Sequence, residues 1–190
     1  MRIISGRLGG RDLGKVPDGV RPTSDRVRES LFSALGSIEG LCVLDLFAGT
    51  GALGLEAYSR GARRVVFVER SRRVVRALRR RLANLDLDPA QHESISLLEA
   101  PALRALRRLS GDAEAQFDLV FLDPPYADGD REETLEALFG SEILGPEGRV
   151  VVEGPKRHPL PPLPGMRVVN ERRYGDTLLT WLEASTVVGG

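Results

Sequence analysis

The chain has 190 residues, and its 27 Lys or Arg side chains are balanced by 27 Asp or Glu side chains, so the formal net charge is zero. A hydrophobic fraction of 42% with 28% charged residues excludes a disordered or fibrous protein and predicts a globular one with a sizeable core. Zero net charge argues against a nucleic-acid partner, but that conclusion depends on where the charges lie along the chain.

Cysteine and histidine are scarce. Cys42 is the only cysteine and begins an apolar run, so we expect a buried thiol and no disulfide within the chain. Neither His92 nor His158 has a Cys or His at metal-ligand spacing, and we predict no metal site. The first residues lack the apolar stretch of a signal peptide, and no run approaches the length of a membrane span. These features predict a cytoplasmic protein without a membrane partner.

The first half of the chain divides into a basic extension and alternating elements. Residues 1–22 are rich in Gly and Arg and contain two prolines, which predicts an N-terminal extension with at most a short β-hairpin outside the core. A domain over residues 23–185 follows. It begins with a helix from near Asp25, capped by Thr23 or Ser24 and ended by Gly36. A strand at 42–47, a Gly-rich turn, a helix to about 59 and a strand at 65–68 come next.

The second half continues the alternation. Ser71 is predicted to cap an amphipathic helix with an arginine-rich outer face, and strands are expected at 95–98, 117–122 and 149–153, with helices near 103–109 and 131–139. Two last strands, at 167–174 and 177–183, form a hairpin around Gly175 and Asp176. This order predicts an α/β fold: a mostly parallel seven-stranded sheet with helices on both faces and an antiparallel hairpin at its end.

The Gly-rich turn predicts a nucleotide-containing cofactor. Residues 49–54 match the pattern G-x-G-x-x-G between a strand and a helix, and Glu69 ends the next strand. The glycines let the backbone approach a ligand, and the carboxylate can accept both ribose hydroxyls. A dinucleotide and an adenosyl cofactor both fit this pattern. Asp45, inside the preceding strand, favours the adenosyl cofactor because a carboxylate repels a pyrophosphate and attracts the ammonium group of a methionine moiety.

The sequence Asp-Pro-Pro-Tyr at 123–126 predicts a site for an amine. It follows the fourth strand, at the edge where open α/β sheets bind ligands. The Asp123 carboxylate and the Pro124 carbonyl can accept the two N–H groups of a nucleobase amine and direct its nitrogen at a methyl donor. Tyr126 can stack on the base, and Asp123 can take the released proton. The alternative is a rigid turn with a buried tyrosine.

Together these residues resemble class I S-adenosylmethionine-dependent methyltransferases that act on exocyclic amines. From residue 1 to about 183 the chain is similar to the bacterial 16S rRNA guanine-N2 methyltransferase family. The motifs that carry this similarity are MRIISG at 1–6, RPTSDRVRESLF at 21–32, DLFAGTGALG at 45–54, DPPY at 123–126 and YGDT at 174–177. The resemblance implies a Rossmann-like fold, S-adenosylmethionine as cofactor, and N2-methylation of one guanosine in 16S rRNA within a small-subunit ribosomal particle.

The resemblance also implies a set of cofactor contacts. The family often ends its third strand with Asp or Asn followed by Ala, where this chain has Glu99, Ala100 and Pro101. Adenine recognition is therefore assigned to Glu99 or to backbone groups. The implied cofactor residues are Asp45, Phe47, Ala48, Gly49, Gly51, Glu69 and Glu99, and the implied catalytic residues are Asp123, Pro124 and Tyr126.

The zero net charge conceals a strong separation of charge along the chain. Residues 60–81 carry a net charge of +9, and residues 82–148 carry −11. An arginine-faced helix is usually a solvated surface, so the N-terminal arginines are better candidates for contacts with RNA phosphates. We predict that these contacts are made by Arg2, Arg7, Arg11, Arg21 and Arg26. Neutrality therefore does not exclude RNA.

Three other functions compete with this hypothesis. An N6-adenine methyltransferase that acts on DNA or RNA would use the same chemistry. An RNA-binding assembly factor without activity would have no need of Asp123, and an NAD-dependent oxidoreductase fits neither Asp45 nor the closing hairpin. We expect a monomer whose partner is 16S rRNA in a small-subunit particle.

Overall fold

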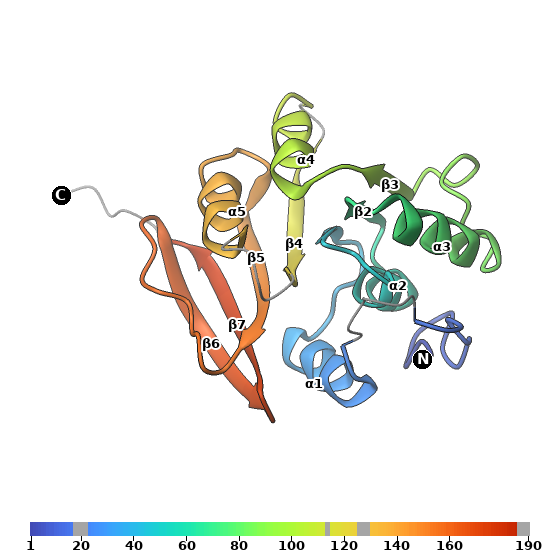
Figure 1. Cartoon of the computed structure of the whole chain (residues 1–190), viewed down its shortest axis with the longest axis horizontal. Helices are drawn as coiled ribbons and strands as arrows, with labels where there is room; N and C mark the ends of the chain where they lie inside the picture. Colours follow the sequence, from blue (N-terminus) through green and yellow to red (C-terminus); the bar gives the residue numbers. More distant parts are fainter. Residues whose placement is uncertain (17–22, 113–114, 125–129, 186–190) are drawn as a thin grey trace.

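The computed structural model describes residues 1–16, 23–112, 115–124 and 130–185. Within them lies a sheet with the strand order β3-β2-β1-β4-β5-β7-β6 (Figure 1). The strands are β1 (Cys42–Leu46), β2 (Arg64–Glu69), β3 (Ile95–Glu99), β4 (Phe117–Leu122), β5 (Leu144–Pro155), β6 (Met166–Tyr174) and β7 (Thr177–Ala184). The pairs among β1 to β5 are parallel, and β7 runs antiparallel to both β5 and β6. The predicted architecture is confirmed.

Helices cover both faces of the sheet, as predicted. They are α1 (Asp25–Leu35), α2 (Ala52–Ser59), α3 (Arg72–Ala83), α4 (Ala102–Leu109) and α5 (Asp130–Phe139). Side chains of α1, α2 and α3 belong to one apolar cluster, whereas those of α4 and α5 belong to the cluster on the other face. The central strand β1 is buried along its whole length, which explains its continuous apolar run. Among the described helices, none has both the length and the apolar character needed to cross a membrane.

The helix and strand ends agree with the sequence in part. Ser24 caps α1, where its hydroxyl accepts a hydrogen bond from Val27 N at 3.3 Å, and Gly36 follows with φ +74°. Ser71 is the N-cap residue of α3, as predicted, but its side chain makes no capping hydrogen bond. The Glu69 carboxylate serves this helix end instead, since its Oε1 accepts from Ser71 N at 2.7 Å. Strand β5 starts earlier than predicted because the turn-like residues 145–148 form part of it, opposite an irregularity in β4.

The N-terminal segment, residues 1–15, contributes to the core. Ile3 and Leu13 are 1% and 2% exposed and belong to the cluster of α1, α2 and α3. The expectation that this stretch lies outside the core is therefore wrong, because its few apolar residues are buried by helices that are distant in the sequence. Arg2 and Asp12 pair in an antiparallel bridge, which agrees with a short hairpin. The proposed division of the chain at residue 22 lies outside the described residues.

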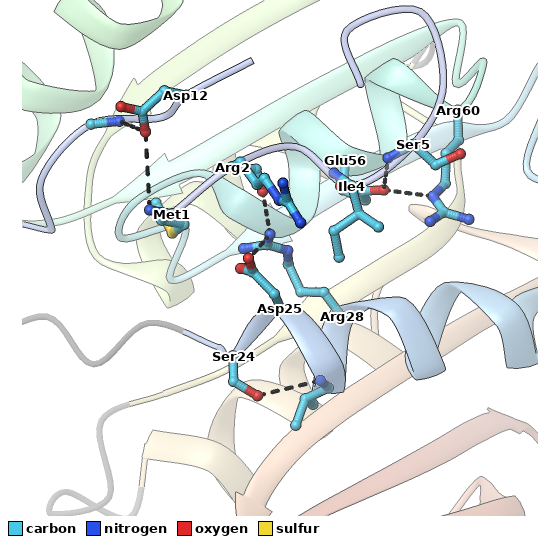
Figure 2. Close-up of polar contacts among 12 residues, drawn as sticks. Met1, Arg2, Ile4, Ser5, Asp12, Ser24, Asp25, Arg28, Glu56 and Arg60 are labelled. Carbon is cyan, nitrogen blue, oxygen red and sulfur yellow. Dashed lines mark hydrogen bonds and ion pairs between the residues drawn. The ribbon is translucent and has the colours of Figure 1, made fainter. Parts of the chain in front are cut away.

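Polar contacts hold the N-terminal segment on α2. The Glu56 carboxylate, fully buried, accepts hydrogen bonds from Ile4 N at 2.7 Å and Ser5 N at 3.1 Å and pairs with Arg60 (Figure 2). Arg28 of α1 donates to the Arg2 carbonyl and to Asp25. These hydrogen bonds hold the N-terminal segment in a fixed position, although its glycine-rich sequence favours a flexible chain.

Candidate active site

The carboxyl ends of the parallel strands bring the predicted site residues to one edge of the sheet. Asp45 of β1 is in register with Phe67 of β2 and with Phe121 of β4. Glu69 and Glu99 end β2 and β3 side by side, and Asp123 directly follows β4. The Gly-rich turn lies between Asp45 and α2 at the same edge. Residues from four separate parts of the sequence therefore face one region, as open α/β sheets require of a ligand site.

The Gly-rich turn adopts an unusual backbone conformation. Phe47, Gly49 and Gly51 have φ values of +64°, +51° and +75°. Glycine adopts this left-handed region freely, but phenylalanine is strained there. Hydrogen bonds of 2.8 Å from Ala48 N to Val68 O and of 2.6 Å from Gly51 N to Ala48 O hold the turn. The strained backbone brings the N-terminus of α2 to the edge.

Asp45 is buried behind this turn. Its carboxylate is 3% exposed and accepts a hydrogen bond from Gly54 N at 2.9 Å. Burial raises the pKa of Asp45 to about 7; the Gly54 N–H opposes this shift, and the nearby Glu69 charge adds to it. A side chain at residue 54 would overlap the Phe67 ring and lie 3.0 Å from the carboxylate, so the pattern needs glycine there. Asp45 thus supports α2 and changes charge near neutral pH.

Asp45 predicts a pH-dependent stability. Its pKa of about 7 in the folded chain exceeds the value of 3.8 for an ordinary aspartate, so between these values the folded state holds a proton that the unfolded chain has released. Asp45 therefore adds to the free energy of unfolding at low pH, and this contribution is lost as the pH rises through about 7. Asp45→Asn keeps an acceptor for Gly54 N–H but cannot ionise, and we expect it to remove this component. Urea unfolding between about pH 5 and 8 measures both slopes, and equal slopes would contradict the prediction.

Glu69 and Glu99 offer carboxylates beside the turn. Glu69 accepts hydrogen bonds from Gly49 N at 3.1 Å and from Ser71 N at 2.7 Å, one on each oxygen. Each oxygen keeps a second lone pair, which suits a pair of ribose hydroxyls. Glu99 is exposed and forms an ion pair of 3.0 Å with Arg72. This arrangement fits an adenosyl cofactor with an amino-acid tail: Asp45 is a carboxylate for the cationic amino group, Glu69 is a carboxylate for the ribose diol, and the glycine turn allows close approach.

Asp123 and Pro124 lie next to this cluster, Asp123 partly exposed and Pro124 buried. Tyr126 lies outside the described residues. Leu122 pairs with Val152, so Asp123 is level with Glu153 of β5.

Glu153 is a site residue that the sequence analysis missed. It is 8% exposed and accepts a hydrogen bond from the Thr23 hydroxyl at 3.0 Å, which ties the start of α1 to the carboxyl edge. Like Glu69, it is an acidic residue at the end of a buried apolar run, and this signal could have found it.

Arg81 is a second residue that sequence reasoning missed. Its guanidinium is 8% exposed, and it donates to Thr50 O at 2.7 Å, to Lys15 O at 3.1 Å and to Leu13 O. Burial lowers the pKa of Arg81. One side chain therefore joins the Gly-rich turn to the N-terminal segment. The signal was its spacing, because position 81 lies three residues after Leu78, on the apolar stripe of α3.

The arginines predicted to contact RNA are not all close to this edge. Arg2, Arg7 and Arg11 are exposed, but Arg7 lies 3.7 Å over the Tyr58 ring, at the end of α2 farthest from the Gly-rich turn. Arg26 is exposed in the first turn of α1, close to Thr23 and the carboxyl edge. Arg21 lies outside the described residues. Among the described side chains, no cluster of His, Cys, Asp or Glu is placed to hold a metal ion.

Comparison with known proteins links this site to one family. Residues 1–183 match the family described as conserved hypothetical protein 95. The chain is 39% identical over 168 residues to ribosomal RNA small subunit methyltransferase D of Escherichia coli K12, covering 86% of this chain and 79% of that protein. The identity to the protein of the same name from Haemophilus influenzae is 37%, with 84% and 81% covered. The solved structure of a hypothetical protein from Thermus thermophilus superposes with a TM-score of 0.79 at 31% identity and covers 97% of this chain and 99% of that one.

Proposed function

The chain belongs to the family described as conserved hypothetical protein 95 and is similar to small-subunit rRNA methyltransferases, and we propose that it methylates the exocyclic N2 amine of a guanosine in 16S rRNA. It is a class I methyltransferase whose cofactor is S-adenosylmethionine. The observation that carries the proposal is the position of Asp123 and Pro124, at the carboxyl edge beside the Gly-rich turn and Glu69. We further propose that it acts in the cytoplasm as a monomer on a small-subunit particle.

The Gly-rich turn and the carboxylates around it would hold the cofactor. Glu69 would accept the ribose hydroxyls, and Asp45 would attract the ammonium group, directly or through water. Glu99 or backbone groups would meet the adenine, and the backbone of residues 47–51 would line the rest. When bound, S-adenosylmethionine supplies an electrophilic methyl group on a sulfonium sulfur.

Asp123 and Pro124 would position the amine. The Asp123 carboxylate and the Pro124 carbonyl accept the two N2–H groups of a guanine turned out of its RNA stack. These two acceptors would fix the orientation of the amine, and Tyr126 would stack on the base. The Asp123 carboxylate would accept the proton that N2 loses on methylation and would pass it to water. Positioning is the main catalytic contribution in this scheme.

Methyl transfer to defined substrates tests the proposal. Labelled S-adenosylmethionine is supplied with small-subunit particles, naked 16S rRNA and DNA, and the products are digested to nucleosides. We expect the label in N2-methylguanosine of 16S rRNA. Label in N6-methyladenosine, or in DNA alone, would identify an adenine methyltransferase. Binding of cofactor and RNA without transfer to any substrate would favour the assembly factor.

A further inference from the structure

Four basic residues lie where β5 and β6 end. Lys156 and Arg157 follow the end of β5, and Arg172 and Arg173 lie near the end of β6, next to the β6–β7 turn. We call these four residues the basic rim. Arg172 pairs with Leu179 of β7, and Arg173 pairs with Leu178. Lys156 N donates to Asp176 O at 2.9 Å, which joins the loop after β5 to the β6–β7 turn. The basic rim therefore lies at the same sheet edge as Asp123.

The strand register gives the distance between the basic rim and the candidate catalytic residue. Asp123 is level with Glu153, which pairs with Leu179, which pairs with Arg172. Neighbouring strands lie about 4.8 Å apart, so the backbones of Asp123 and Arg172 are separated by about 14 Å. A polynucleotide held at Asp123 would reach the basic rim within a few nucleotides.

The basic rim has charge available for an anionic partner. All four side chains are exposed, and Arg172 lies 6.0 Å over the Trp181 ring of β7. Lys156 pairs with Asp176 at 2.9 Å, but both side chains are exposed, and such pairs contribute little energy and open readily to a competing phosphate. Asp176 and the exposed Glu171 are the acidic groups closest along the chain. Arg131 donates to His158 O at 3.0 Å, which holds the loop in place.

The proposed cofactor residues occupy one half of the carboxyl edge, and the half at β5, β7 and β6 remains for the substrate. Glu69, Glu99 and the Gly-rich turn occupy the ends of β1, β2 and β3, and α3 flanks that half (Figure 1). A polynucleotide that delivers a base to Asp123 must therefore leave room for the cofactor and cross the ends of β5, β7 and β6. Resting on the proposed function, we infer that the basic rim binds RNA phosphates that flank the target guanosine.

Charge-neutralising variants test the basic rim. In the double variant Arg172→Gln/Arg173→Gln, we expect the KM for the RNA substrate to rise about tenfold and the slope of log affinity against log salt to fall by about 1.4–1.8, the loss of two phosphate contacts. The Kd for S-adenosylmethionine and kcat at saturating RNA should stay within about twofold of wild type, because neither residue contacts the cofactor or the reacting atoms. Arg79→Gln/Arg80→Gln removes the same charge from exposed positions of α3 and is the matched control.

An unchanged salt slope in Arg172→Gln/Arg173→Gln would overturn the inference, and so would an equal loss of affinity in the α3 control. Binding is measured on RNA without methyl transfer, so the result does not depend on which base is modified. Methylation of adenine by the wild-type protein would contradict the proposed guanine specificity, but the salt dependence of RNA binding would still test the role of the basic rim. Tighter binding of DNA than of RNA through these residues would also contradict it.

Discussion

Replacing Asp123 by alanine is expected to lower kcat by about 10²- to 10⁴-fold, the range for loss of a group that positions and deprotonates the reacting amine. Asp123 lies at the carboxyl edge, one residue beyond β4, while the cofactor groups belong to β1, β2 and β3. The affinity for S-adenosylmethionine should therefore change by less than about twofold. Single-turnover rates and calorimetric titration of the cofactor measure the two effects, and Asp123→Asn should lie between wild type and alanine because it keeps one acceptor oxygen.

Asp118 provides the matched control on the same strand. It lies near the amino end of β4, where its carboxylate accepts a hydrogen bond from Cys42 N at 2.8 Å. Asp118→Ala should lower the Tm but leave kcat unchanged at temperatures where the protein is folded. An Asp123→Ala variant that loses cofactor binding instead of turnover would contradict the role assigned to Asp123.

Replacing Arg81 by methionine is expected to weaken cofactor binding about 10- to 100-fold, or about 1.4–2.8 kcal/mol. The change leaves the carbonyls of Leu13, Lys15 and Thr50 without their buried donor, and each such loss is costly. The Gly-rich turn then loses a support, and the N-terminal segment loses one of its anchors. Arg81→Lys should recover part of the affinity, since an ammonium group can reach some of these carbonyls but lacks the planar fork.

Hydrogen exchange of residues 1–15 separates this role from a general loss of stability. In the wild-type protein, S-adenosylmethionine should slow exchange in the N-terminal segment, because Arg81 links that segment to the turn. The link should be absent in Arg81→Met and intact in Arg80→Met, whose side chain is exposed on the same helix. An Arg81→Met protein with a lower Tm but wild-type cofactor affinity would show that Arg81 is only structural.

Much of the fold could be predicted because its signals are local. The parallel strands are mostly apolar runs, and several turns and helix ends carry Gly, Pro or a capping residue close in sequence, such as Ser24 before α1. The site residues Asp45, Glu69 and Asp123 could be predicted for a related reason: a polar residue at the end of a buried parallel strand necessarily lies at the carboxyl edge. Their roles in binding and catalysis stay predictions that the experiments above test.

The remaining features depend on contacts between distant segments. At the start of α3, the Ser71 side chain makes no capping hydrogen bond, and the Glu69 carboxylate of the preceding strand accepts from Ser71 N instead. Ile3 and Leu13 belong to the core, and Glu56 and Ser59 of α2 are among the residues that hold the N-terminal segment there. The Arg81 and Glu153 side chains look like ordinary surface charges until the partners that bury them are known.

The sequence by itself determined the order of the elements, the α/β class and the residues at the carboxyl edge, because apolar periodicity and turn chemistry act over a few residues. Tertiary structure alone decided which of the many arginines are buried and which are exposed. The net charge is zero, and the basic and acidic residues are concentrated in different segments of the chain. Neither property predicts where a given side chain lies in the folded protein. Packing buries Arg81 against three carbonyls and leaves Arg172 and Arg173 exposed at the same sheet edge as Asp123, since burial and register are set by segments that meet only in the folded chain.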